Sequence, residues 1–230
     1  MQAPCPAWPI RQMRIWPSSL VTTTAADDVQ DLAITPNGRF LLTASATGTV
    51  VRTYTIDAST GALGSALTLD TGSPISSLAV DVSGKFAYVT DSVAGMLRQY
   101  RINAQTGALS PIAAVDYTLE SIAGAPQGIA VDPQGSFVFT ADSTGNNVSI
   151  FSIGSGTGAL TYIDSFPAGT DPIAVTTDYS GSFISVATSG GELSTFRLER
   201  DTPRLEPVDT ETTGAAITEP ATVVTSSHSE

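Results

Sequence analysis

The sequence contains an internal repeat. The tripeptide Gly-x-Phe occurs four times, and its glycines are spaced by 46, 51 and 46 residues. The four copies are Gly38-Arg39-Phe40, Gly84-Lys85-Phe86, Gly135-Ser136-Phe137 and Gly181-Ser182-Phe183. A repeat of this length restricts the chain to architectures in which similar units stack side by side.

Two further motifs recur in the same register. An aromatic residue follows each repeat phenylalanine by thirteen or fourteen positions, as Tyr54, Tyr100, Phe151 and Phe196. The tetrapeptide Thr-Gly-Ala-Leu then begins at Thr60, Thr106 and Thr157, and Thr202-Pro203-Arg204-Leu205 replaces it in the fourth unit. The shared register indicates that all four units have one structure.

Each unit reads as four short strands. In the third unit, residues 128–131 form an apolar run, residues 132–135 have the Asp-Pro-x-Gly pattern of a type I turn, and residues 137–141 form a second apolar run. Because this second strand is apolar on both faces, we expect both faces to be covered. Asp81 and Asp132 begin such turns, which favours a scaffold role for both.

The second half of the unit completes the blade. In the second unit, the third strand alternates, with Tyr100 and Ile102 on one side and Gln99 and Arg101 on the other. Thr-Gly-Ala-Leu then supplies a glycine turn into a fourth strand. With no convincing amphipathic helix, the pattern predicts an all-β fold, a β-propeller of four-stranded antiparallel blades, with about four complete blades plus partial blades at both ends.

These residues resemble a known family. The stretch from Pro126 to Asp142, closed by Thr-Gly-Ala-Leu, resembles the seven-bladed lactonase propellers, which include bacterial 6-phosphogluconolactonases and carboxymuconate cyclases. Tyr88-Val89-Thr90-Asp91 is similar to the YVTN repeat of bacterial surface-layer propellers. The resemblance covers about residues 27–205 and implies the architecture. It carries over no catalytic residue, because the repeated positions are scaffold.

The two ends predict incomplete blades. Residues 10–15 align with residues 97–102 as a third strand, so residues 1–26 are predicted to be a partial blade ahead of four repeats in 27–205. Residues 206–230 are predicted to hold a connecting fourth strand and the first strand of a truncated fifth repeat.

The length allows two interpretations of these ends. The 230 residues give five units at a period near 46, whereas the resembling family uses seven. A fragment of a longer propeller is the favoured interpretation. The alternative is a five-bladed ring closed by the two termini, but its joined blade would lack a second strand. An open arc would expose the apolar faces of its end blades, so we expect self-association.

Composition excludes several classes of function. Lys and Arg total 10 against 22 Asp and Glu, a net charge of −12, which argues against a nucleic-acid or anionic-membrane surface. No apolar stretch is long enough to span a membrane. Cys5 and His228 are the sole residues of their types, so an internal disulfide and a multi-Cys or multi-His metal site are not expected. Residues 1–16 lack the continuous apolar run expected of a signal peptide, so the cytoplasm is the default expectation, although the charge-poor composition also suits export.

The best-placed polar groups lie in loops at one face of the predicted propeller. Asp91 and Asp142 end second strands, while Asp171, Glu120 and Gln127 fall in the connections between blades. Both kinds of loop surround the mouth of the central channel in a propeller. Such an acidic rim could bind a cation or a polyhydroxylated substrate, and the alternative is a plain solvated surface.

The resemblance implies hydrolysis of a sugar lactone, as in a 6-phosphogluconolactonase. That reaction needs a base to activate water and a group to hold the developing oxyanion, and related enzymes use His, Arg and Glu. His228 matches no such motif, and Arg52 and Arg98 recur at one strand position, which indicates scaffold. The catalytic residues therefore stay unassigned. The alternatives are a non-catalytic YVTN-type binding module, which would have a protein partner, and an inactive fragment. No cofactor is expected, and a divalent cation is left open.

Overall fold

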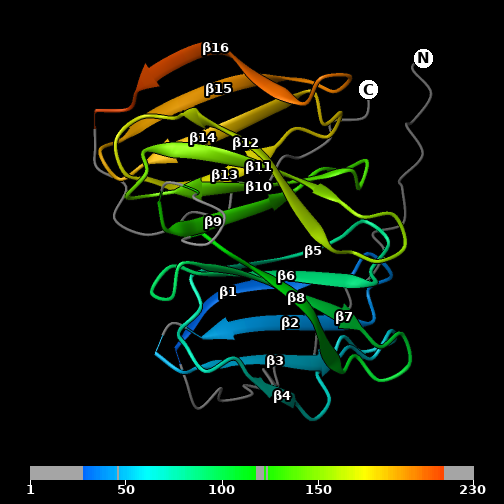
Figure 1. Ribbon diagram of the computed structural model, residues 1–230. Helices are drawn as coiled ribbons and strands as arrows, with labels where there is room; N and C mark the ends of the chain where they lie inside the picture. Colours follow the sequence, from blue (N-terminus) through cyan, green and yellow to red (C-terminus); the bar gives the residue numbers. More distant parts are fainter. Residues whose placement is uncertain (1–27, 46, 118–121, 123, 215–230) are drawn as a thin grey trace, which may run out of the picture.

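The computed structural model describes residues 28–45, 47–117, 122 and 124–214. These residues form sixteen strands in four sheets, and each sheet contains four consecutive antiparallel strands. No helix occurs in this part of the chain, and accordingly none there could cross a membrane. The predicted all-β propeller fold with four-stranded blades is confirmed (Figure 1).

Each blade corresponds to one sequence repeat. The first blade contains β1 (Val29–Ile34), β2 (Phe40–Ser45), β3 (Val50–Thr55) and β4 (Leu67–Asp70). The second contains β5 (Ser77–Val80), β6 (Phe86–Asp91), β7 (Met96–Ile102) and β8 (Leu109–Asp116). The third contains β9 (Pro126–Val131), β10 (Phe137–Asp142), β11 (Asn147–Ile153) and β12 (Leu160–Pro167). The fourth contains β13 (Pro172–Thr177), β14 (Phe183–Thr188), β15 (Glu192–Glu199) and β16 (Arg204–Thr212).

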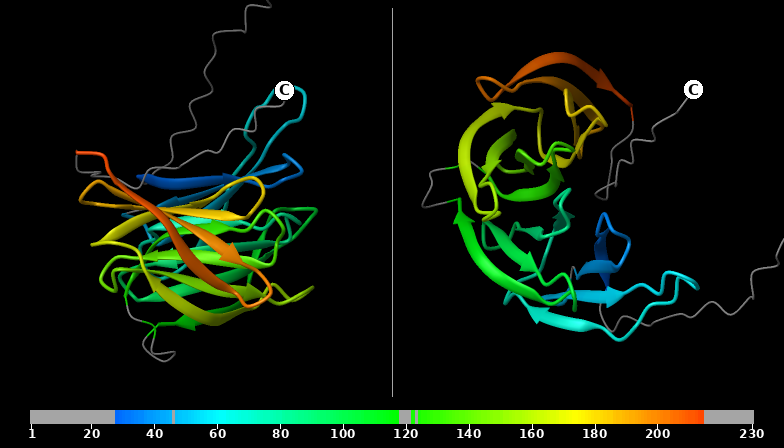
Figure 2. Two further views of the ribbon diagram at one scale, coloured as in Figure 1. Left: turned by 90° about the horizontal axis from the view of Figure 1, so that it is seen from above. Right: turned by 90° about the vertical axis from the view of Figure 1, so that its right-hand side faces the viewer.

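The four blades follow one another around an arc (Figure 2, right), with the first and fourth blades at its two ends. The first strands of successive blades are neighbours, β1 with β5, β5 with β9 and β9 with β13, so these strands line the axis. Residues 1–26 and 215–230, which hold most of the predicted partial blades, lie outside the described residues.

The turn between the first and second strands is organised by an aspartate, as predicted. In the second blade, Oδ1 of Asp81 accepts hydrogen bonds from the backbone N–H groups of Lys85 (2.8 Å) and Phe86 (2.7 Å). Gly84, inside this turn, has φ +67°, a conformation that costs a glycine little. The repeated Asp-x-x-Gly pattern is thus explained by turn geometry.

The hydrophobic core lies between blades. Three clusters of buried side chains join the first blade to the second, the second to the third, and the third to the fourth. All six residues of β6 and of β10 are buried, which confirms that the second strand is covered on both faces. Gln99, on the opposite side of β7 from Tyr100, is also buried, and its Oε1 accepts a hydrogen bond from Leu160 N–H of the next blade at 2.9 Å.

Candidate functional site

A cavity of about 150 Å³ lies where the first strands of all four blades meet. Its lining comes from β1, β5, β9 and β13, so every blade contributes to it. The polar side chains that line it are Gln30, Asp31, Ser76, Ser77 and Thr176. The cavity is therefore the candidate binding site, located at the axis of the arc.

One repeat position controls how closely the blades approach this axis. The residue seven positions before the turn glycine is Asp31, Ser77, Gly128 or Ala174 in the four blades. A Cβ atom at Gly128 would lie 2.8 Å from the carbonyl oxygen of Ile173 in the fourth blade. Small residues are thus used where the third and fourth blades meet, and Asp31 is the exception in the series.

The carboxylate of Asp31 is held rigidly at the cavity. Its Oδ2 accepts hydrogen bonds from the Ser77 hydroxyl (2.6 Å) and from Leu78 N–H (2.9 Å), both in the second blade. Its Oδ1 accepts a hydrogen bond from Leu32 N–H at 2.7 Å. Asp31 is the one ionisable residue among the described lining residues, and three donors fix its orientation.

Sequence reasoning missed Asp31. The signal that could have identified it is present in the repeat, because a charged residue stands where the other three units have serine, glycine or alanine. A residue that departs from its own repeat is not required by the turn and strand pattern that all four units share.

Asp91, a predicted candidate, is fully buried at the end of β6. Its Oδ2 accepts a hydrogen bond from Arg98 Nη2 at 2.8 Å, in a salt bridge. Its Oδ1 accepts from the Ser73 hydroxyl (2.9 Å) and from Ala94 N–H (2.8 Å). These partners tie two loops to β7, so the carboxylate acts within the structure rather than at an open surface.

Asp142 occupies the same position in the third blade but has no cation beside it. Ser149 replaces Arg98 there, and its hydroxyl donates to Oδ2 of Asp142. No described residue hydrogen-bonds to the other oxygen, Oδ1. Burial raises the pKa of Asp142 to about 7, against a lowering by Ser149 and by the nearby hydroxyls of Thr140 and Tyr117.

The hydroxyl groups of Tyr117 and Thr140 complete this buried cluster, and they lie 2.7 Å apart. Burial also raises the pKa of Tyr117 well above its usual value, so the phenol stays neutral. Because Asp142 has no exposed surface, a substrate in solution does not reach it in this conformation.

The remaining candidates lie in or beside the connections between blades. Asp171 has φ +53°, its N–H donates to Oδ1 of Asn146 (2.8 Å), and its Oδ2 accepts from the Ser189 hydroxyl (2.6 Å). Gln127 is half-buried at the start of β9. Glu120 lies outside the described residues. The cavity lining includes none of the four described candidates. The three aspartates instead accept hydrogen bonds from neighbouring loops and strands, and the backbone carbonyl of Gln127 accepts one from the Thr90 hydroxyl.

A metal centre is not evident in the described ranges, where no three His, Cys, Asp or Glu side chains are grouped to hold an ion. The acidic residues instead bind backbone N–H groups, hydroxyls and arginines.

Comparison with known proteins identifies the family. Residues 31–224 match the family described as "Lactonase, 7-bladed beta-propeller". The chain belongs to this lactonase family. The match begins at Asp31, within β1, and extends through the fourth described blade. A search of curated proteins finds no match.

Solved structures agree with the fold of this lactonase-family chain. A functionally unknown protein from Desulfotomaculum acetoxidans has a TM-score of 0.70 and 19% identity over 83% of this chain and 58% of its own. The Pseudomonas aeruginosa periplasmic gluconolactonase has a TM-score of 0.69 and 18% identity, covering 82% and 55%. A Bacteroides fragilis protein, described provisionally as a 6-phosphogluconolactonase, has a TM-score of 0.68 and 21% identity, covering 80% and 55%. The chain thus spans little more than half the length of these structures.

Proposed function

We propose that this lactonase-family propeller hydrolyses a neutral sugar lactone, bound in the axial cavity beside Asp31. The observation that carries the proposal is the position of Asp31, a rigidly held carboxylate lining a cavity to which every described blade contributes. Membership of a lactonase family supports the reaction class.

Lactone opening needs a base, and Asp31 is the group placed to provide it. In this scheme Asp31 accepts a proton from the attacking water as the water oxygen bonds to the lactone carbonyl carbon. The ring C–O bond then breaks, and the leaving alkoxide takes the proton back from Asp31, which gives the open-chain hydroxy acid and restores the carboxylate. The hydrogen bonds from Ser77 and Leu78 orient the carboxylate for this step.

The charge of the lining favours a neutral substrate. None of the described residues that line the cavity is basic, whereas a phosphate group on the substrate would need Arg or Lys. The whole chain carries a net charge of −12, which also repels a phosphorylated lactone. An unphosphorylated sugar lactone fits better, and the P. aeruginosa relative is named a gluconolactonase.

A non-catalytic binding role is the second candidate. The same absence of a basic side chain in the described lining leaves no cation to stabilise an oxyanion. In that case the cavity would bind a polyol or sugar without turnover.

Turnover of glucono-1,5-lactone and of its 6-phospho derivative, corrected for spontaneous hydrolysis, tests the proposal. We expect hydrolysis of the neutral lactone, and at least a ~100-fold lower kcat in Asp31→Asn, because a general base contributes about that factor or more. Asp209→Asn is the matched control, since Asp209 is exposed on β16 and also accepts a hydrogen bond from the next residue's N–H.

Three outcomes contradict the proposal. Saturable sugar binding without hydrolysis would establish the second candidate. Preference for the phosphorylated lactone would contradict the assignment of a neutral substrate. Full activity in Asp31→Asn would remove Asp31 from the reaction.

A further inference from the structure

The blades of this chain pack through a repeated contact between a phenylalanine and a glycine. The repeat phenylalanine of one blade lies on the turn between the third and fourth strands of the next blade. A Cβ atom at Gly107 would lie 2.7 Å from the ring of Phe40, and one at Gly158 would clash still more closely with Phe86. Phe40 and Phe86 are consequently only 1% and 4% exposed.

The third junction uses a variant of this contact. The fourth blade has Pro203 in place of the turn glycine. Arg200 lies over the ring of Phe137, 5.8 Å from its centroid, and also binds Asp132 of the third blade with a shortest distance of 2.6 Å. Phe137 is 8% exposed, so it too is covered by the blade that follows.

A second contact accompanies the first. This contact involves the turn between the first and second strands. The residue after the aspartate of that turn, or after its equivalent Thr35, packs against the glycine of the same turn in the following blade. A Cβ atom at that glycine would meet its partner at 3.4 Å, 2.7 Å or 3.2 Å. The pairs are Pro36 with Gly84, Val82 with Gly135, and Pro133 with Gly181.

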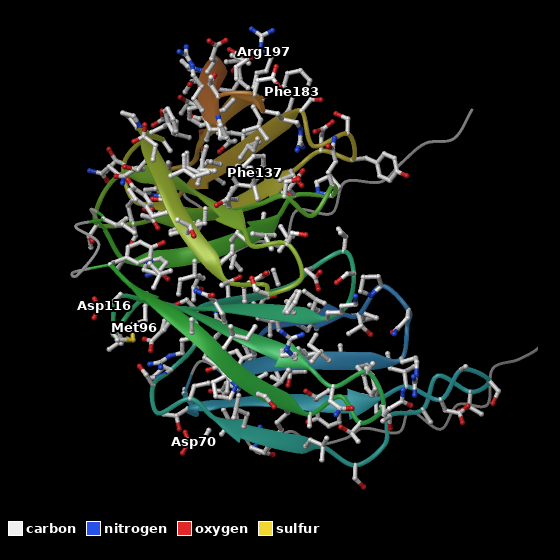
Figure 3. The ribbon with its side chains drawn as sticks, turned by 45° about the vertical axis from the view of Figure 1, so that its right-hand side comes forward. Asp70, Met96, Asp116, Phe137, Phe183 and Arg197 are labelled. Carbon is white, nitrogen blue, oxygen red and sulfur yellow. The ribbon has the colours of Figure 1, made fainter. Side chains whose placement is uncertain are left out.

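The two ends of the arc carry the unmatched halves of both contacts. On the fourth blade, Phe183 is 41% exposed and Tyr179 is 80% exposed (Figure 3 labels Phe183, beside Arg197). On the first blade, Gly61 and Gly38 occupy the equivalent glycine positions, and a Cβ atom at either would meet nothing within 4 Å. Within residues 28–214 as the structure describes them, the fourth blade thus presents two uncovered rings, and the first blade presents the two uncovered glycines.

We propose that the fourth blade of one chain docks on the first blade of a second copy, with Phe183 on Gly61 and Tyr179 on Gly38. The occupant is a second copy because each chain carries both halves, and because the contact continues an interface that the chain already forms three times internally. Such a head-to-tail contact is heterologous, so two arcs form a ring if the rotation closes and a longer chain of arcs if it does not. This inference is independent of lactone chemistry.

Sedimentation velocity of the 230-residue protein over a range of concentrations tests the docking. We expect concentration-dependent association that strengthens with added salt, because salt screens the repulsion between copies of net charge −12. Phe183→Asp and Gly61→Asn should each weaken self-association at least ~10-fold, the first by placing a charge in the contact and the second by filling the glycine position. Asparagine is chosen because it tolerates the φ of +73° at Gly61.

Mixing the two variants distinguishes this geometry from a symmetric dimer. Phe183→Asp retains an intact first blade and Gly61→Asn retains an intact fourth blade, so an equimolar mixture should recover association through one junction. A symmetric contact between like faces would not recover in this way. Val93→Asp is the control, because Val93 is 77% exposed in the β6–β7 loop and lies in neither contact.

Circular dichroism establishes that each variant folds, and Phe183→Ser replaces Phe183→Asp if the charge prevents folding. The proposal is overturned by a wild-type chain that stays monomeric at every concentration, which would leave these faces to other blades of a longer propeller. It is also overturned if Phe183→Asp associates as tightly as the wild type, or if the mixture stays monomeric.

Discussion

Asp91 and Asp142 occupy the same position in successive blades, at the ends of β6 and β10. Both carboxyl groups are fully buried, but Asp91 forms a salt bridge with Arg98, whereas Asp142 faces Ser149. The consequence is electrostatic. A buried carboxylate without a cation is costly to ionise, so Asp142 keeps a proton to a higher pH than an exposed aspartate.

The raised pKa of Asp142 makes the stability of the fold depend on pH. Its pKa is about 7 in the folded protein and 3.8 when unperturbed, so between these values the folded state binds more protons than the unfolded state. The contribution of Asp142 to stability therefore falls as pH rises through this window, by on the order of 4 kcal/mol in total. Asp142→Asn should stabilise the protein at pH 8, and its advantage should disappear towards pH 4, as measured by urea unfolding.

The matched control for this experiment is Asp91→Asn. That change leaves the partly buried Arg98 without its carboxylate, so it should destabilise the protein at pH 8, the opposite sign to Asp142→Asn. Equal effects of the two substitutions, or a gain from Asp142→Asn that is independent of pH, would contradict the assignment of the raised pKa to Asp142.

At the scale of the element, the turn between the third and fourth strands closes the blade and also receives the neighbouring blade. Gly61 and Gly158 stand at the same place in Thr-Gly-Ala-Leu, and both have φ +73°. They differ in their surroundings, because a Cβ atom at Gly158 would clash with the ring of Phe86, whereas one at Gly61 would meet nothing within 4 Å. Among the described residues, the same motif therefore closes its own blade in both cases, and at Gly158 it also receives the phenylalanine of another blade.

Two single substitutions, Gly61→Ala and Gly158→Ala, separate the role of the glycine in its own turn from its role in the contact with another blade. Each change carries the same backbone cost of about 1 to 2 kcal/mol for the left-handed conformation. Gly158→Ala additionally forces Phe86 to move, which should cost a further ~1 to 3 kcal/mol by overpacking. The free energy of unfolding, measured in urea at a dilution where the chain is monomeric, should therefore fall more for Gly158→Ala. Equal losses would show that the Phe86 contact does not stabilise the blade interface.

The sequence could predict those parts of the structure that every repeat shares. The Asp-x-x-Gly turns, the doubly covered second strand and the four-stranded blade depend on local residue patterns that occur three or four times. Contacts between blades were harder to foresee, because Gln99 meets Leu160 across an interface whose alignment no single repeat specifies. The cavity carboxylate Asp31 was missed for the opposite reason, since it occurs once and repeated motifs direct attention away from it.

At the scale of the whole molecule, stability depends on how many neighbours each blade has. Among the four described blades, the second and third are covered on both sides, while the first and fourth each have one described neighbour (Figure 2). In a stacked-repeat architecture each unit is stabilised by its own strands and by its interfaces with adjacent units. The ends of the arc should therefore open more readily than its centre.

Hydrogen exchange can compare two equivalent strands whose blades differ in the number of described neighbouring blades. β10 and β14 are the second strands of their blades. All six residues of β10 are buried, whereas Phe183, the first residue of β14, is exposed to solvent. The backbone amides of β14 should exchange at least ~10-fold faster than those of β10, because opening the fourth blade breaks one interface instead of two. At concentrations where the chain self-associates, the amide exchange of β14 should become slower, while that of β10 should stay unchanged. If both strands exchange at one rate, the four blades open as a single cooperative unit, and the missing neighbour has no energetic consequence.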